Sequence, residues 1–542
     1  MKKHQRNLII IFIVSSLVFL FNLDTLPVNI MEARNFVTAR EMVEDGNWIL
    51  TTMNGEARYE KPPLPTWLTA FSGMVGGIQN VTFLRIPAAI CSIVLMLYLY
   101  FLNFRITQSK EFSLMATLVA TTSYLIVFMG RQGTWDIFCH TFTIISIYYL
   151  FEGLQSKDKE WKNWMLGGVF LGLSILSKGP VSLYALFLPF LIAYGIVYRY
   201  QLKSKLPQLI IYIIIALLIG GSWYGYISIM DTHAANEISD KETTAWVNRN
   251  VKPFYRYFTF FVQSGIWVVP TLIGLLYPYL KDKVFSKKAY QLFFWWTILS
   301  VILLSLIPEK KERYLLPVMI PMATTTAFFF DCIIKEKFSL VKREHYIVQF
   351  IIGLVGIVAI LLPIGIYIVS DSVNWIRFIL LAIGSISIGI YLFMSLRRKD
   401  YSKSFFSIIG FMTLFAFLGM PLVLNFFPKN ENYTSIENLK EEIKKQNLAL
   451  FTYEFYSPEL WFQYGQKMKV FDLQKEKEYP NHFLVLTSEK DSLKQNLNSL
   501  YLIDSIKSFD HNNFGEKANN YTHRLSYTLY KLNKKYSEIN SE

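Results

Sequence analysis

The chain has 542 residues, of which 53% are hydrophobic and 17% are charged, and its formal net charge is +14 at pH 7. Soluble domains carry about 25% charged residues, and the apolar residues here occur in long runs, so this composition excludes an ordinary soluble enzyme. The basic residues lie mostly in short loops between these runs, as the positive-inside rule produces, whereas nucleic-acid binding needs a basic face on a soluble domain. We therefore expect contact with membrane lipids and no binding of nucleic acid.

Thirteen apolar runs have the length of a membrane-spanning helix, which needs about 20 residues to cross a hydrocarbon core about 30 Å thick. The runs cover residues 8–23, 83–104, 113–130, 137–153, 163–180, 182–198, 207–228, 258–280, 290–307, 314–334, 347–370, 375–396 and 404–426. No small-residue cleavage site follows the first run, which indicates an uncleaved first span rather than a signal peptide. Only a turn at Gly179-Pro180 separates the fifth and sixth runs, so counts of 12 and 14 stay open.

Lys and Arg concentrate in alternate loops, and these loops define the cytoplasmic side together with the basic N-terminus. With an odd number of spans, the C-terminal segment lies on the opposite side. We predict a multi-pass protein of a bacterial inner membrane, with a cytoplasmic N-terminus and an extracytoplasmic, periplasmic C-terminal segment.

Two segments depart from the pattern of spans and short loops. Residues 24–82 form a long first external loop, in which residues 31–45 place apolar side chains among charges at helical spacing; this predicts an amphipathic helix in the membrane interface. Near the C-terminus, helix-like stretches alternate with the strand-like stretches LALFTYEF, HFLVLTS and RLSYTLYKL. We predict a polytopic α-helical membrane domain over residues 1–428 and a small extracytoplasmic α/β domain over residues 429–542.

Polar residues gather on the predicted external side. The loop PEKKERYLLP carries Lys310, Lys311 and Arg313, and a basic cluster on this side breaks the positive-inside rule. A phosphate ligand explains it, because Arg and Lys both bind phosphate. Simpler explanations stay open: the cluster could balance anionic lipid, Lys178 could extend from its span end to the interface, and Asp136 could pair with Arg131.

The stretch EARNFVTAREMVEDGNWILTTMNGEARYEKPPLPTWL resembles the first external loop of the GT-C class of membrane glycosyltransferases. The similarity continues in FLRIPAA, GRQGTWDIF, SKGP, PFYRYF and KKERYLLPVMIPMA, over residues 31–321. The chain resembles the protein O-mannosyltransferase superfamily, and most of all its bacterial branch, which transfers aminoarabinose to lipid A. The resemblance implies GT-C architecture, with about 13 spans and an external C-terminal domain. It also implies an enzyme that takes a sugar from a polyprenyl phosphate such as undecaprenyl phosphate, with no required cofactor.

The resemblance also implies which residues form the site. Donor phosphate is expected on cations, and the substrate-binding set comprises Arg34, Arg58, Glu60, Lys61, Arg131, Lys178, Lys311, Arg313 and Tyr314. Glu32 and Asp136 are the expected catalytic carboxylates. The family usually has Asp-Glu at the outer end of the first span, whereas this chain has Met31-Glu32.

The change at Met31 leaves two interpretations. Either Glu32 takes over the role of the missing carboxylate, or the acceptor needs no base. A phosphate is already ionised at neutral pH, whereas a Ser or Thr hydroxyl must lose a proton. The missing Asp therefore favours lipid A or another envelope glycolipid as acceptor, with protein O-glycosylation as the alternative.

Other interpretations concern a metal and other classes of function. Glu60 and His233 could hold a divalent metal together with donor phosphate, although transition-metal sites usually have more than two protein ligands. A lipid-linked-sugar transporter is an alternative, but transporters often show two related halves with broken helices, and the sequence shows neither. A non-catalytic binding relative is a second alternative. Retention of four residues of the family's site favours a working enzyme: Lys61, Asp136, Lys178 and Arg313.

Overall fold

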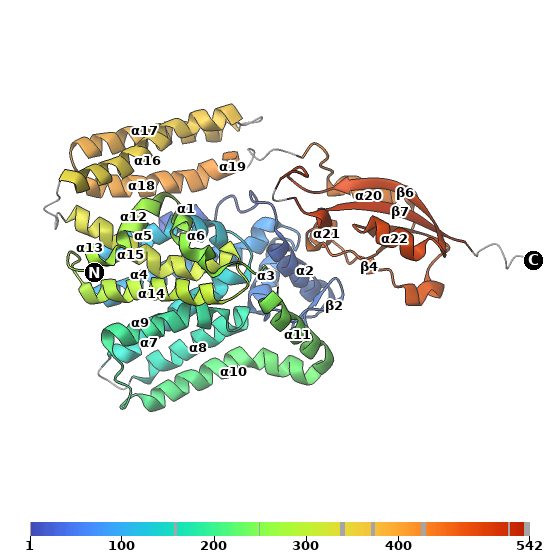
Figure 1. Ribbon diagram of the computed structural model, residues 1–542, viewed down its shortest axis with the longest axis horizontal. Helices are drawn as coiled ribbons and strands as arrows, with labels where there is room; N and C mark the ends of the chain where they lie inside the picture. Colours follow the sequence, from blue (N-terminus) through green and yellow to red (C-terminus); the bar gives the residue numbers. More distant parts are fainter. Residues whose placement is uncertain are drawn as a thin grey trace, which may run out of the picture.

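The computed structural model describes residues 2–156, 160–248, 250–335, 342–369, 374–423, 430–518 and 521–535. A helical bundle forms one end of the molecule and a small sheet domain forms the other (Figure 1). Helices α2 (Ile30–Asp45) and α3 (Leu64–Gly76) lie where the two meet. The predicted domain boundary at residues 428 and 429 lies outside the described residues.

The bundle is built from the N-terminal helix and from helices of the second to thirteenth apolar runs. Its first half contains α1 (Lys2–Phe19), α4 (Val81–Thr107), α5 (Lys110–Thr121), α6 (Tyr124–Gly130), α7 (Trp135–Gln155), α8 (Trp161–Lys178), η1 (Leu183–Phe187), α9 (Leu188–Tyr198) and α10 (Leu206–Met230). The polar helix α11 (Thr232–Asn248) follows α10 outside the apolar runs. Its second half contains η2 (Phe254–Trp267), α12 (Val268–Gly274), α13 (Tyr277–Leu280), α14 (Lys287–Leu306), η3 (Glu312–Leu315), α15 (Leu316–Ile334), α16 (Lys342–Val369), α17 (Trp375–Arg397), α18 (Tyr401–Leu414), η4 (Phe415–Gly419) and α19 (Met420–Val423).

The chain is a multi-pass membrane protein, but the predicted count of thirteen spans is not confirmed. Nine described helical segments are long and apolar enough to cross a membrane, or ten if α5 and α6, which meet at 67°, form one broken span. Three of the predicted runs form helices that are not long or apolar enough to count as spans: α1, α8 and the stretch η1–α9. Helices α1 and α8 have charged residues at their ends, and the η1–α9 stretch is shorter.

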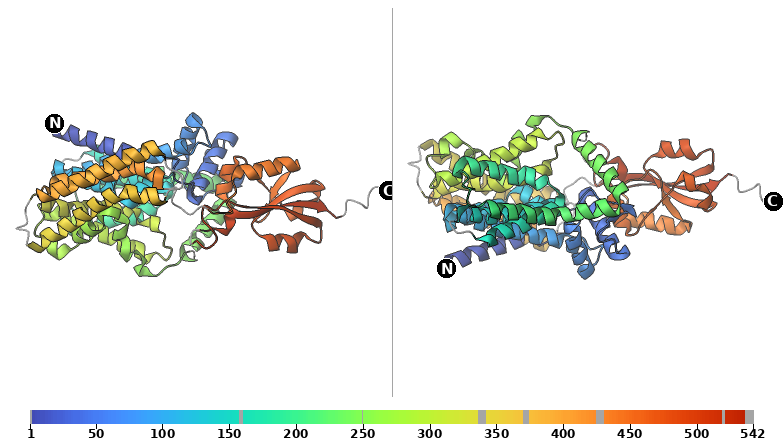
Figure 2. Two further views of the ribbon diagram at one scale, coloured as in Figure 1. Left: turned by 90° about the horizontal axis from the view of Figure 1, so that it is seen from above. Right: turned by 90° about the horizontal axis from the view of Figure 1, so that it is seen from below.

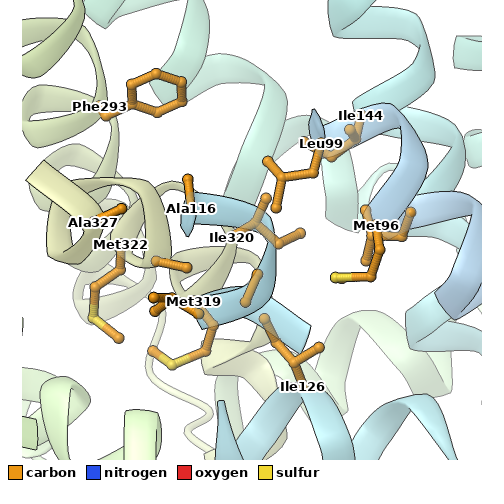
Figure 3. Close-up of a cluster of buried hydrophobic side chains, with 14 of the residues drawn as sticks. Met96, Leu99, Ala116, Ile126, Ile144, Phe293, Met319, Ile320, Met322 and Ala327 are labelled. Atoms are coloured by element: carbon orange, nitrogen blue, oxygen red, sulfur yellow. The ribbon is translucent and has the colours of Figure 1, made fainter. Parts of the chain in front are cut away.

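Helix α15 forms the centre of the bundle. Of its apolar window, 94% is buried, and Met319 and Ile320 pack among side chains from α4, α5, α6, α7 and α14, including Met96, Leu99 and Phe293 (Figure 3). By contrast, only 28% of the corresponding windows of α10 and α17 is buried, so these helices present their apolar side chains to lipid. The helices that bring polar groups to the site are therefore the inner ones.

Helix α2 forms where the amphipathic pattern predicts a helix. Asn29 caps its first turn in a capping box with Glu32, and Gly46 ends it in the left-handed conformation, with φ of 78°. Ten of its sixteen residues are buried, including Arg40 and Glu41, and its location in the membrane interface stays a prediction. It packs between the bundle and the sheet domain, so Glu32, Arg40 and Glu41 face protein partners, whereas Glu44 is exposed.

The C-terminal domain has a five-stranded mixed sheet (red in Figure 2) with the strand order β4-β3-β5-β7-β6. Its strands are β3 (Leu450–Thr452), β4 (Lys469–Val470), β5 (His482–Thr487), β6 (Tyr501–Asp510) and β7 (Ser526–Lys534). Its helices are α20 (Ile436–Gln446), α21 (Pro458–Tyr464), η6 (Leu473–Glu478), α22 (Lys490–Leu497) and η7 (His523–Leu525). Strand β3 pairs in parallel with β4 and β5, and β7 pairs antiparallel with β5 and β6.

Strand β5 shows how this sheet is covered on both faces. Successive side chains of a strand point to opposite faces. Leu484 and Leu486 accordingly pack with α20 and α21, whereas Phe483 and Val485 pack with α22. The three stretches predicted as strands coincide with β3, β5 and β7.

Candidate active site

A cavity of about 640 Å³ lies where the first external loop meets the bundle. Six basic and three acidic side chains line it, an excess of three positive charges when all are ionised. The basic residues are Arg34, Arg58, Lys61, Lys178, Lys311 and Arg313, and the acidic residues are Glu60, Asp136 and Glu309. Apolar side chains from the chain after α8 and from the end of α14 line much of the remainder. The cavity is thus suited to a ligand with an anionic part and an apolar part.

An ion pair between Asp136 and Lys178 joins two helix ends in this cavity. Asp136 lies in the first turn of α7 and Lys178 in the last turn of α8, so each charge is stabilised by the dipole of its own helix. Gly179 follows with a positive φ of 75°, which ends α8 within the motif SKGP. The pair is buried, so Lys178 does not extend to the interface, and Arg131 is not the partner of Asp136.

The loop before α15 arranges further charges around Tyr314. The ammonium of Lys178 lies 5.4 Å from the centroid of the Tyr314 ring, and the guanidinium carbon of Arg313 lies 5.5 Å from it. The Tyr314 hydroxyl donates to Glu309 at 3.0 Å, and Lys311 pairs with the same carboxylate. This loop therefore holds two of the six cations in fixed positions.

A tight hairpin positions the cations of the first loop. Strands β1 (Thr52–Met53) and β2 (Glu56–Ala57) are joined by Asn54 and Gly55, both at positive φ, which is the backbone that a two-residue hairpin turn needs. Glu41 of α2 accepts hydrogen bonds from the amides of Asn54 at 2.6 Å and Gly55 at 3.1 Å. Just after the hairpin, the guanidinium of Arg58 stacks 4.8 Å from the Trp135 ring centroid.

Nine of the eleven residues expected to bind substrate or catalyse line this cavity, and Glu32 and Arg131 do not. Glu32 is fully buried and accepts two hydrogen bonds from Arg85, at 2.6 and 2.8 Å. It also accepts from the Gly133 amide at 2.9 Å and the Asn29 side chain at 2.8 Å. The structure therefore does not bring Glu32 to the cavity, and a catalytic role for Glu32 stays a prediction that its hydrogen-bond partners do not favour.

Arg131 likewise lies outside the cavity, so its expected contact with phosphate stays a prediction. Its guanidinium donates to the carbonyl of Val18, in the last turn of α1, at 2.5 Å, and to those of Phe21 at 2.6 Å and Asn22 at 2.7 Å, just beyond that helix. A helix leaves its last carbonyls without partners inside the helix, and Arg131 supplies donors for this region. Burial, with Arg85 nearby, lowers the pKa of Arg131 to about 10, so it stays charged at neutral pH.

The structure does not bring Glu60 and His233 together at the cavity. Glu60 lines it, whereas His233 lies on α11 and is not among the lining residues. Within the described ranges of the chain, no group of three or more His, Cys, Asp and Glu side chains is placed to hold a metal ion.

Several residues at the site were missed in the sequence. Glu309 lies inside the motif PEKKERYLLP, and His140 follows Asp136 by one helical turn, yet neither was recognised as a lining residue. Met31 also lines the cavity, so an apolar side chain occupies the position at which the family usually has an Asp. For His140 the available signal was a His within the apolar run 137–153, whereas Glu309 lies in a charged motif and gives no such signal.

Comparison with known proteins agrees with this geometry. The family model described as dolichyl-phosphate-mannose-protein mannosyltransferase matches residues 60–223. In structure, the chain is similar to ArnT from Cupriavidus metallidurans bound to undecaprenyl phosphate, with a TM-score of 0.63, 13% sequence identity and coverage of 97% of both chains. The chain has the GT-C fold. The GT-C fold expected from the sequence motifs is thus confirmed, whereas the number of spans and the external location of the C-terminal domain stay predictions.

Sequence relatives point to the expected branch of GT-C proteins. The chain is 25% identical to undecaprenyl phosphate-alpha-4-amino-4-deoxy-L-arabinose arabinosyl transferase 2 of Proteus mirabilis, over 61% of this chain and 60% of that protein. It is 22% identical to the corresponding transferase of Photorhabdus laumondii, over 68% of each. It is 24% identical to an uncharacterized protein of Aquifex aeolicus, of which it spans 58%. The chain thus spans about three fifths of the Aquifex and Proteus relatives, and the expected resemblance to this GT-C branch is confirmed.

Proposed function

We propose that this protein is a glycosyltransferase that moves a sugar from a polyprenyl-phosphate donor to a phosphate-bearing envelope glycolipid such as lipid A. The observation that carries the proposal is the single cavity with six cations, three carboxylates and apolar walls. The proposed reaction takes place on the extracytoplasmic face, which is where the positive-inside rule places the first loop. The curated relatives named as aminoarabinose transferases support this choice of donor and acceptor.

The cations provide the chemistry for a phosphate leaving group. As an acceptor oxygen bonds to the anomeric carbon, the bond from that carbon to the phosphate oxygen breaks, and the electron pair leaves with the polyprenyl phosphate. Lys61, Lys178 and Arg313 are placed to stabilise this negative charge in a site already organised before the reaction. The Tyr314 ring contacts both Lys178 and Arg313 and fixes their positions before the reaction. These two cations therefore do not need to move during transfer.

The carboxylates of the cavity favour an acceptor that is already ionised. Met31 supplies no carboxylate and Glu32 is bound to Arg85. Asp136 and Glu309 are each paired with a lysine, and Glu60, the third carboxylate of the cavity, lies 3.9 Å from the guanidinium of Arg58. A carboxylate held by a cation accepts a proton less readily than one without such a partner. A phosphate oxygen on the acceptor can attack without losing a proton, and the excess positive charge of the cavity attracts it.

A reconstituted reaction tests this proposal. Purified full-length protein is given undecaprenyl phosphate-linked 4-amino-4-deoxy-L-arabinose and either lipid A or a Ser/Thr-containing peptide, and products are weighed by mass spectrometry. We expect lipid A to gain the mass of the sugar with wild-type protein and not with Arg313→Ala. The matched control is Lys403→Ala, which changes an exposed lysine of α18 that is paired with Asp400.

Other outcomes would assign other functions. Transfer to the peptide and not to lipid A would make the protein an O-glycosyltransferase, and Asp136 or Glu309 would then be the candidate base. Donor binding without transfer to either acceptor would support a transporter or a non-catalytic binding protein. Cells with and without the gene provide the same comparison for native lipid A and glycoproteins.

A further inference from the structure

We propose that the C-terminal domain is part of the phosphate-binding site, because its Tyr456 positions the guanidinium of Arg34. This inference rests on the proposed function, since it concerns the binding of a phosphate group in the same cavity. The phosphate can belong to the donor or to the acceptor, and the experiment below separates the two. Tyr456 is a positioning residue in this proposal, and Arg34 is the group that contacts phosphate.

The C-terminal domain is fixed to the first external loop by buried polar contacts. Arg40 of α2 is 1% exposed and donates to the carbonyl of Trp461 at 2.9 Å. Asn54 of the hairpin forms two hydrogen bonds with the backbone of Met468, donating to its carbonyl at 2.9 Å and accepting from its amide at 2.8 Å. Paired bonds of this kind set both the distance and the rotation of one segment on the other.

An apolar cluster continues across the same contact. It joins side chains of α2 to side chains of α21 and of the sheet: Ala33, Phe36, Val37, Leu460, Trp461, Phe462, Leu484, Leu486 and Leu529. The rings of Phe36 and Phe462 lie 5.3 Å apart between centroids. Since fully buried apolar clusters typify a single core, the domain is not a loosely tethered appendage.

Tyr456 lies between β3 and α21, where the domain contacts Arg34, a residue that lines the cavity. The guanidinium carbon of Arg34 lies 5.4 Å from the centroid of its ring, within the range of a cation–π contact. Trp461 meets the same ring edge-on, with centroids 5.3 Å apart, and so limits its rotation. The charges acting on the Tyr456 hydroxyl come from three residues that line the cavity, Arg34, Arg58 and Glu60.

The contact has a direct consequence for Arg34. A guanidinium that stacks on an aromatic face keeps its edge N–H groups available for a bidentate contact with phosphate. Arg34 also donates a hydrogen bond to the Tyr456 hydroxyl, and its Nη1 lies 4.0 Å from the Met31 sulfur. Its buried Nε has no hydrogen-bond partner within the described part of the chain. The ring of Tyr456 is therefore what orients this cation toward the cavity.

The test compares Tyr456→Ala and Tyr456→Phe in full-length protein. The measured quantities are the Kd for undecaprenyl phosphate, the KM for the aminoarabinose-bearing donor and the KM for lipid A. We expect Tyr456→Ala to raise the Kd and the donor KM about tenfold if Arg34 binds donor phosphate, or the lipid A KM alone if it binds the acceptor. Tyr456→Phe keeps the ring and loses only the hydroxyl that Arg34 contacts, so it should lose clearly less than Tyr456→Ala in the same quantity. The matched control is Tyr433→Ala, since Tyr433 is about equally exposed, at 47% against 45%, but its ring meets His511 edge-on rather than Arg34.

A double-mutant cycle excludes a merely structural effect. If Tyr456 acts through Arg34, adding Tyr456→Ala to Arg34→Gln should change binding no further. Additive losses would overturn the proposal, as would a fall in kcat with unchanged Kd and KM, or a loss in Tyr456→Phe as large as in Tyr456→Ala. If wild-type protein fails to bind undecaprenyl phosphate or to transfer sugar, the proposed function and this inference are both overturned. If the enzyme is active but the Tyr456 variants have wild-type Kd and KM values, the inference alone is overturned.

Discussion

Replacing Glu32 by glutamine removes the negative charge of a buried ion pair while keeping the size of the side chain. Glu32 and Arg85 are both fully buried, and the guanidinium donates to both carboxylate oxygens. Removing one partner of a buried pair leaves the other charge uncompensated, which destabilises a protein by about 3–5 kcal/mol. The amide nitrogen of glutamine would also face the Arg85 donors, so one hydrogen bond is lost with the charge.

The assay separates stability from chemistry. Thermal unfolding of the purified protein, followed by tryptophan fluorescence, should show a lower Tm for Glu32→Gln than for wild type. Sugar transfer per folded molecule, measured well below that Tm, should stay close to wild type, because Glu32 does not line the cavity. The matched control is Glu44→Gln on the same helix, whose side chain is 46% exposed and should change neither quantity. An unchanged Tm with transfer abolished would refute the structural role and return Glu32 to the chemistry.

Further predictions concern the cavity and the C-terminal domain. Arg313→Ala should lower the rate of transfer about 10²- to 10³-fold with little change in Tm, because it removes a charge that stabilises the leaving phosphate; an unchanged rate would contradict this. Asp136→Asn should lower both the rate and the Tm, because it leaves buried Lys178 without its carboxylate, and a wild-type Tm would count against the pair. Burial lowers the pKa of His511 from 6.5 to about 4. Between these pH values the unfolded chain binds more protons than the folded chain, so the free energy of unfolding should fall as the pH falls from 6.5 to 4, by on the order of 3 kcal/mol. His511→Phe should remove this part of the pH dependence of unfolding, and an unaltered dependence would show that another group causes it.

The helical elements were largely accessible from the sequence because their signals are local. The capping residues and spacing that predict α2 lie within the helix itself, and each apolar run overlaps described helices. Strand β6 was missed because its polar sequence, YLIDSIKSFD, lacks clean alternation: it is an edge strand with a bulge between Ser505 and Lys507 and mostly exposed side chains. The burial of α2 could not be predicted from the sequence, because the domain that covers this helix lies some 400 residues later in the chain.

The same distinction explains the candidate site. The cations of EKPP, SKGP and KKERYLLP were found because each motif resembles a family motif, and nine of the eleven expected residues share one cavity. Glu32 and Arg131 carry the same kinds of charge in the same loops, but their partners are remote: Arg85 is 53 positions from Glu32, and Val18 is 113 positions from Arg131. Whether a charge faces a ligand or a structural partner depends on such remote contacts, which a single sequence does not display.

The pairing of Arg85 and Arg131 with the segment after α1 bears on how the protein is made. Arg85 donates to the carbonyls of Leu23 and Leu26, and Arg131 donates to those near the end of α1. During translation the first helix enters the membrane long before Arg131 leaves the ribosome. The segment between α1 and α2 therefore gains its hydrogen bonds to Arg131 only late in synthesis. Proteases should cut this segment in nascent chains arrested before Arg131 and leave it intact in longer chains. The end of α1 is thus inserted into the membrane first but is among the last parts of the bundle to form its final hydrogen bonds.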